Sequence, residues 1–176
     1  MRMRELGQDD FSEYYQSVVD GVDGMVEWAL LVDRLVVKET SFYRDPNSLN
    51  FVGRHCSETV QKNGPNCSID LWSVGCSTGE EPYCLAMVVN NAFQAMNYDP
   101  LFGITATDIS HGALAFAREG TYNERKVERV ASSSRRRYFS ALGEGKYRVV
   151  PELRERICFS QGNILNIEQM PAVQMD

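Results

Sequence analysis

Apolar side chains recur at helical spacing along the first part of the chain. From Phe11 to Leu35 the segments FSEYYQSVV and GMVEWALLVDRLVV follow this spacing, which predicts helix. Gly21, Asp23 and Gly24 interrupt the pattern and predict a turn between two helices. The mixed stretch SFYRDPNSLNFV then predicts a connector leading into a short helix, and the Asn-Gly-Pro chemistry of QKNGPNCS predicts a loop.

From residue 69 onward, short apolar runs alternate with helical segments. IDLWSVGC and FGITATDI have the length and turn boundaries of buried strands. Between them, apolar residues lie on one face of a predicted helix, at Leu85, Val88, Val89, Ala92, Phe93 and Met96. Ser110 is the predicted N-cap of the helix HGALAFARE, which Gly120 ends. This order predicts an α/β domain with a parallel sheet and right-handed crossovers, and KYRVV and RICFSQGNI are further strand candidates.

The turn after the first predicted strand carries two acids, Glu80 and Glu81. It matches neither GxxxxGK[ST] nor GxGxxG, and a pyrophosphate would lie poorly beside the acids. Thr78, three residues before Glu81, has the spacing of a capping box, and Pro82 fits the first turn of a helix. Carboxylates accept hydrogen bonds from ribose hydroxyls and pair with a sulfonium group. The turn therefore favours a phosphate-free cationic nucleoside such as S-adenosylmethionine.

Three polar features follow predicted strands and should meet at one sheet edge. They are the glycine turn at Gly75, the acid Asp108 and the amide Asn163. In open α/β sheets ligands bind beyond the carboxyl ends of the strands. Each feature has a structural alternative: the glycine as simple punctuation, and Asp108 as the cap of the next helix. Their order along the chain favours a ligand site.

Composition excludes several classes of protein. The 176 residues are 43% hydrophobic and carry a net charge of −6, which argues against a nucleic-acid binder. No apolar run reaches the ~20 residues of a membrane span, and the amino terminus lacks a secretory apolar core, so a cytoplasmic protein without membrane insertion is expected. The five cysteines form no CxxC pair, which favours reduced thiols over a metal site. Six basic residues against two acids between Glu124 and Arg137, including Arg135 to Arg137, predict either a surface for an acidic partner or a solvated helix.

A set of motifs extends through most of the chain in a fixed order. They are KETSFYRD, WSVGCSTGEEPY, TATDIS, RYF and FSQGNILN. This set resembles the CheR-type methyltransferases, which methylate glutamate side chains of bacterial chemotaxis receptors with S-adenosylmethionine and release S-adenosylhomocysteine. The resemblance implies an incomplete Rossmann-like class I methyltransferase domain preceded by a helical segment and carrying a small antiparallel β insertion.

The family's site residues can be placed on this chain by motif. The resemblance implies that Arg44 is both a cofactor contact and the residue tied to activity. It implies further cofactor contacts at Thr40, Glu81, Asp108 (ribose), Asn163 and Ile164 (adenine), beside the turn glycine Gly75. No metal site is expected. Without the resemblance, Arg44 would be interpreted as an ordinary surface arginine.

The resemblance also implies domain limits and partners. We expect a partial helical domain and linker at 1–60 and a cofactor domain at 61–176, cut short at its carboxyl end, with a β-subdomain at about 136–158. Lys38 replaces the family's asparagine. The expected partner is the cytoplasmic domain of a chemotaxis receptor or of a pilus-system receptor, and the sequence indicates no oligomeric state. Two alternatives stay open: a non-catalytic regulator that binds cofactor or receptor, and a small-molecule methyltransferase.

Overall fold

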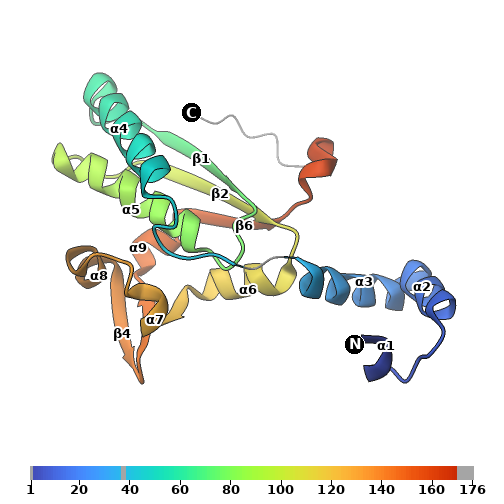
Figure 1. Cartoon of the computed structure of the whole chain (residues 1–176). Helices are drawn as coiled ribbons and strands as arrows, with labels where there is room; N and C mark the ends of the chain where they lie inside the picture. Colours follow the sequence, from blue (N-terminus) through green and yellow to red (C-terminus); the bar gives the residue numbers. More distant parts are fainter. Residues whose placement is uncertain (1, 37–38, 170–176) are drawn as a thin grey trace. The chain divides into compact units, whose positions relative to one another are not determined.

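A computed structural model describes residues 2–36 and 39–169 of the protein (Figure 1). The chain divides into two compact units, Met1–Val37 and Lys38–Asp176. The sequence places the domain boundary near residue 60 instead. The difference arises because helix α4 (Pro46–Asn63) packs along helix α5 (Glu80–Ala95), within the second unit.

Over its described residues, 2–36, the first unit has three helices: α1 (Arg2–Glu5), α2 (Phe11–Val19) and α3 (Gly21–Leu35). The predicted turn at residues 21–24 is wrong, because the chain bends at Asp20 alone and α3 begins at the next residue. Gly24 lies inside α3, where an added Cβ would come within 2.7 Å of the Val18 carbonyl oxygen. This glycine therefore permits close approach of two helices and forms no turn.

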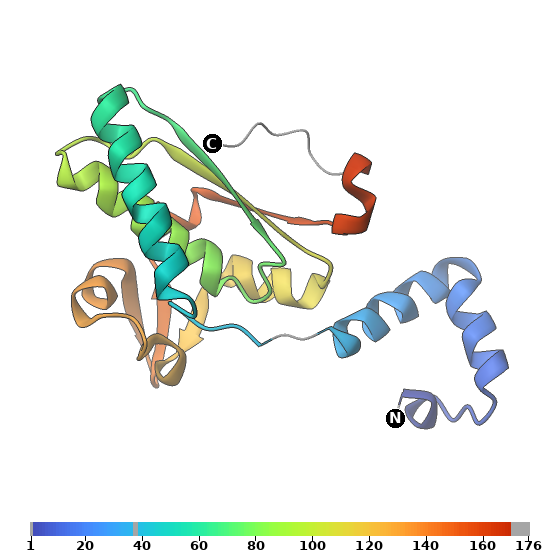
Figure 2. The ribbon, with the colours of Figure 1, turned by 45° about the horizontal axis from the view of Figure 1, so that its top comes forward.

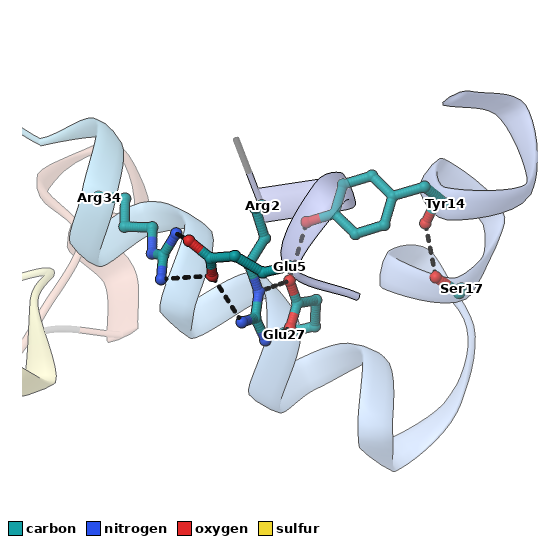
Figure 3. A network of polar contacts seen from close by, with 6 residues as sticks. All are labelled: Arg2, Glu5, Tyr14, Ser17, Glu27 and Arg34. Atoms are coloured by element: carbon teal, nitrogen blue, oxygen red, sulfur yellow. Dashed lines mark hydrogen bonds and ion pairs between the residues drawn. The ribbon is translucent and has the colours of Figure 1, made fainter. Parts of the chain in front are cut away.

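A network of charged side chains fixes α1 and α2 against α3 (Figure 3). Arg2 donates from Nε and Nη2 to the carboxylate of Glu27 at 2.7 and 2.6 Å. Tyr14 donates to the same carboxylate at 2.8 Å. Arg34 donates twice to Glu5 at 2.9 Å, and Arg2 bridges the two groups through a 3.2 Å bond to Glu5. Paired, bidentate contacts of this kind are stronger than isolated surface ion pairs.

The network should make the first unit sensitive to acid. The hydrogen bond from Arg2 lowers the pKa of Glu27 from 4.5 to about 2, and Tyr14 adds to this effect against the opposing effect of burial. A folded-state pKa below the unfolded value stabilises the unit above pH 4.5, and this stabilisation is lost as the pH falls toward 2. We expect the urea midpoint of the unit to fall over that range.

Trp28 reports this unit selectively once the second tryptophan is removed by Trp72→Phe. Fluorescence-monitored urea titrations at a series of pH values measure the effect. Glu27→Gln, which cannot titrate, should flatten the dependence on pH. Equal pH dependence of the urea midpoint in both proteins would contradict the prediction.

The second unit is built on a parallel sheet, as predicted. Strands β1 (Ile69–Val74), β2 (Phe102–Asp108) and β6 (Ile157–Gln161) pair in the order β1-β2-β6. Helix α5 connects β1 to β2, and α6 (His111–Glu119) follows β2. The connections from β1 to β2 and from β2 to β6 run in the same direction across the sheet. Because such crossovers are right-handed, both helices lie on one face of the sheet (Figure 2). The predicted cap is confirmed, since the Ser110 hydroxyl accepts from Ala113 N and Gly120 ends α6 in a left-handed conformation.

Helix α4 is longer than the short helix expected after the connector. Asp45 accepts hydrogen bonds from Asn47 N and Ser48 N, and Pro46 occupies the first turn. Both features start a helix efficiently. The helix has 18 residues and ends at Asn63, with Gly64 as its C-cap. Among the described residues, no helix is long and apolar enough to cross a bilayer.

A small antiparallel sheet accompanies the main one. Its strand order is β3-β5-β4, with β3 (Thr121–Asn123), β4 (Phe139–Gly143) and β5 (Lys146–Val149). The sequence indicated only β5, because β3 is three residues long and β4 exposes four of its five residues. Short helices adjoin it: α7 (Glu124–Val127), α8 (Ser132–Tyr138) and α9 (Pro151–Arg154). Strand β6 stops before its predicted end, and a 3-10 helix (η1, Ile164–Gln169) follows.

Candidate functional site

The turn from Gly75 to Gly79 leaves the carboxyl end of β1 and is anchored to the end of β2. Gly75 N and Cys76 N both donate to the carbonyl oxygen of Thr107, at 2.8 and 2.9 Å. Gly75, Ser77 and Gly79 all have positive φ, at 69°, 48° and 92°. This conformation costs glycine little and strains serine. The turn is therefore a shaped loop, held by the neighbouring strand.

The two glycines are required for different reasons. A Cβ added to Gly79 would meet Ala117 Cβ at 2.9 Å and the Tyr122 hydroxyl at 3.1 Å, so packing demands glycine there. A Cβ added to Gly75 would meet nothing within 4 Å. Gly75 thus borders open space at the sheet edge, where a ligand could contact the backbone closely.

Asp108 joins three elements at the same edge. Its Oδ2 accepts from Ser77 N at 2.7 Å and its Oδ1 accepts from Ser110 N at 2.9 Å. The backbone carbonyl of Asp108 accepts from Gly162 N at 3.1 Å, which brings the segment after β6 to this position. Each carboxylate oxygen keeps further acceptor capacity. A ribose hydroxyl could bind there without breaking either protein hydrogen bond.

The two acids of the turn have different environments. Glu81 is exposed, and its Oε1 accepts from the buried hydroxyl of Ser73 at 2.7 Å. Glu80 is completely buried and forms an ion pair with Lys126. The presence of both acids in the turn favours a cationic ligand, and the resemblance implies a cofactor contact at Glu81. Glu80 is already neutralised inside the protein, so Glu81 is the acid available to a ligand.

The predicted capping box is wrong. Helix α5 begins at Glu80 with Gly79 in the cap position, and glycine has no side chain that could accept a hydrogen bond from the first turn. The Thr78 hydroxyl donates to Glu80 Oε2 at 2.6 Å instead of accepting from the helix backbone. The left-handed Gly79 displaces Thr78 by one residue from the cap position. The second part of the expectation holds, since Pro82 does lie in the first turn.

Asn163 and Ile164 lie where β6 gives way to η1. Asn163 Oδ1 accepts from Leu165 N at 3.0 Å, and Ile164 is 55% exposed. Through the Gly162–Asp108 hydrogen bond, this segment lies next to the end of β2. Gly75, Glu81, Asp108 and Asn163 thus belong to one edge, while their contacts with a cofactor stay a prediction.

The connector that carries Thr40 and Arg44 is fixed against α5 by its aromatic residues. Phe42 is fully buried, and Tyr43 donates from its backbone to Cys84 Sγ at 3.2 Å. Arg44 is exposed and donates to the Glu39 carbonyl oxygen at 3.0 Å. Thr40 is half-buried. Within the described residues no hydrogen bond or ion pair joins Thr40 or Arg44 to Glu81 or Asp108, and the cofactor contacts of Thr40 and Arg44 stay a prediction.

Cys76 lies in the turn but is no nucleophile. It is 1% exposed, and burial, with the nearby charge of Asp108, raises the pKa of its thiol to about 12. The thiol is therefore protonated at neutral pH. In the part of the chain that the structure describes, no group of three or more metal-ligating side chains comes together.

The groups at this edge fit a cationic nucleoside. Carboxylates of Glu81 and Asp108 are available, and Gly75 leaves room for close approach. Ser77 Oγ is buried and has no hydrogen-bond partner among the described residues, which is unusual for a polar atom. A ligand hydroxyl or carboxylate would satisfy it. The sequence predicted no site role for Ser77, because the burial of its hydroxyl depends on the turn's conformation. It predicted none for Ser73, because the contact with Glu81 depends on how β1 packs against α5.

Comparison with known proteins agrees with this chemistry. The family described as CheR methyltransferase, SAM binding domain, matches residues 38–176. Chemotaxis protein methyltransferase 2 of Pseudomonas aeruginosa is 32% identical over 178 residues, which cover 99% of this chain and 61% of that protein. The chemotaxis protein methyltransferase of Borreliella burgdorferi is 29% identical over 172 residues, covering 96% and 60% respectively.

A relative from another pathway is similar as well. The probable biofilm formation methyltransferase WspC of Pseudomonas aeruginosa is 32% identical over 165 residues, covering 94% of this chain and 37% of that protein. The chain thus spans about 60% of the first two relatives. Since the family match includes the connector, the glycine turn and the segment after β6, the chain belongs to the CheR methyltransferase family, in its S-adenosylmethionine-binding domain.

Proposed function

We propose that this protein transfers a methyl group from S-adenosylmethionine to glutamate side chains in the cytoplasmic domains of bacterial chemoreceptors. Family membership supports the reaction class. The observation that carries the proposal is the edge at which Asp108 bonds Ser77 N while Glu81 stays exposed. That arrangement offers acceptors to a cationic nucleoside and has no phosphate-binding glycine motif.

Different residues of the chain would bind different parts of the cofactor. Asp108 would accept from the ribose hydroxyls, and Asn163 with Ile164 would lie beside the adenine. Ser77 and the backbone at Gly75 would contact the amino-acid end. When bound, S-adenosylmethionine would supply an electrophilic methyl group on its sulfonium to a carboxylate oxygen, with the neutral thioether of S-adenosylhomocysteine as the leaving group.

The protein's own contribution is alignment. A glutamate carboxylate with a pKa of ~4.3 is already ionised at neutral pH, so no general base is needed. Holding the reacting groups in line and excluding water can supply roughly 7–11 kcal/mol. We assign Arg44 to this task, because a guanidinium can bind a carboxylate through two parallel hydrogen bonds. Arg44 is exposed, and its hydrogen bond to Glu39 goes to a backbone carbonyl, so its guanidinium could turn toward a ligand.

A basic surface on α8 is the proposed contact with the acidic receptor. Arg135 lies over the Tyr147 ring at 5.8 Å, and Arg137 lies over the Tyr138 ring at 5.3 Å. Stacking on aromatic rings fixes a guanidinium without neutralising its charge. The relatives' names cover chemotaxis and biofilm formation. As the partner of this chain we propose a chemotaxis receptor or a pilus-system receptor, bound through its cytoplasmic domain.

Two measurements test the proposal. Isothermal titration of this chain with S-adenosylhomocysteine should show binding at one site. The natural form of the protein, purified from its own cells, should transfer tritiated methyl groups from S-adenosylmethionine to receptor-rich membranes. The label should appear as base-labile esters. A pool of soluble metabolites should stay unlabelled. Absence of binding heat, or labelling of metabolites alone, would reject the proposed function.

A further inference from the structure

An ion pair connects the small sheet to the candidate cofactor turn. Lys126, on α7, pairs with Glu80 Oε1 and donates to Thr78 Oγ1 at 3.3 Å. The side chain of Glu80 is 0% exposed and that of Lys126 is 34% exposed. Thr78 donates in turn to Glu80 Oε2 at 2.6 Å, and the Tyr122 hydroxyl donates to the Thr78 carbonyl at 2.7 Å. Thr78, the residue after Ser77, is thus held through both its hydroxyl and its carbonyl.

Contacts with several neighbouring residues hold Lys126 in place. Asn123 Oδ1 accepts from Lys126 N at 3.0 Å at the start of α7. The ammonium lies 5.8 Å from the ring centre of Phe116 and 5.9 Å from that of Tyr122. Glu124 N donates to the Gly145 carbonyl at 2.7 Å, which ties α7 to the hairpin between β4 and β5. These contacts fix the ammonium relative to the small sheet.

The turn needs such support. Ser77 has φ 48°, between the left-handed Gly75 and Gly79. Strained residues persist only where surrounding contacts hold them. Thr107 holds the strand side of the turn, whereas Thr78 and Glu80 hold its helix side. Ser77 lies between these two anchors and donates its N–H to Asp108.

We propose that Lys126 is a positioning residue for the cofactor turn, acting through Glu80 and Thr78 on the Ser77–Asp108 hydrogen bond. The inference rests on the proposed function, because it names a further determinant of affinity at the same site. Buried ion pairs contribute little net stability compared with apolar side chains of similar size. A pair placed at this turn is better explained by the geometry that it imposes than by stability.

The test compares variants of this chain by titration with S-adenosylhomocysteine, at a temperature where urea unfolding shows each to be folded. Lys126→Met should weaken binding about tenfold, equivalent to about 1.4 kcal/mol. Lys126→Arg keeps the charge and should restore most of the affinity. Arg125→Met removes a cation from the neighbouring, exposed position of α7 and should leave the dissociation constant unchanged. A purely structural role would lower stability without changing the affinity of the folded protein.

Each outcome decides the matter. Lys126→Met with wild-type affinity, or Lys126→Arg binding no better than Lys126→Met, would overturn the inference and leave the proposed function intact. If Lys126→Met does not fold, Glu80→Gln replaces it. That variant removes the buried charge while its amide can still bond Thr78, so it should weaken binding in the same direction, and wild-type affinity would overturn the inference. Absence of binding by the unmodified chain would overturn both proposals.

Discussion

Asp108→Ala is expected to weaken binding of S-adenosylhomocysteine by about a hundredfold. The carboxylate holds Ser77 N at 2.7 Å and Ser110 N at 2.9 Å, and we propose that it also binds the ribose. Its loss removes the ligand contact and frees a strained turn at the same time. Hydrogen bonds to charged groups contribute about 1.5–3 kcal/mol each, and each 1.4 kcal/mol is a factor of ten in affinity. Isothermal titration measures the effect.

Two further variants interpret the result. Asp99→Ala removes an exposed acid beyond the carboxyl end of α5 and should leave binding unchanged. Asp108→Asn keeps one acceptor oxygen but no charge, so its affinity for S-adenosylhomocysteine should lie between that of the unmodified chain and that of Asp108→Ala. If Asp108→Ala binds within about threefold of the unmodified chain, the ribose assignment is wrong.

The parallel sheet and its helices were predictable because their signals are local. Strands β1 and β2 are short apolar runs between turn residues, and Ser110 and Gly120 mark the ends of α6 as their chemistry requires. Once the strand order is known, the turn at Gly75 and the acid at Asp108 must share an edge. The order of the motifs along the chain thus predicted that Gly75 and Asp108 lie at the same edge of the sheet.

The features that the sequence did not predict depend on contacts between residues far apart in the chain. Lys126 pairs with Glu80 across 46 positions, and nothing in the basic segment distinguishes it from its exposed neighbours. The local sequence predicts a turn at Gly24, whereas the glycine permits close packing of α3 against the Val18 carbonyl. Strand β4 shows no alternation because four of its residues face solvent. Tertiary contacts decide such positions, and periodicity does not record them.

Arg44→Ala is expected to abolish methyl transfer in the protein as its cell produces it, with a fall in kcat/KM of at least about a hundredfold, the order that misplacing a reacting group costs. Arg44 is exposed, and among the described residues its side chain donates to the Glu39 carbonyl. Its replacement should therefore leave the thermal midpoint nearly unchanged. Initial rates with tritiated S-adenosylmethionine and receptor-rich membranes measure the loss. Near-normal turnover would reject the assignment of Arg44.

Matched variants show what Arg44 holds. Arg54→Ala removes another exposed arginine, on α4, and should keep full activity. Arg44→Lys keeps the charge but loses the planar pair of donors, so it should recover only part of the rate. If Arg44 binds the receptor carboxylate, Arg44→Ala lowers the rate while the dissociation constant for S-adenosylhomocysteine stays the same. If Arg44 binds the carboxylate of the cofactor's amino-acid end, that dissociation constant rises as well, because the product carries the same group.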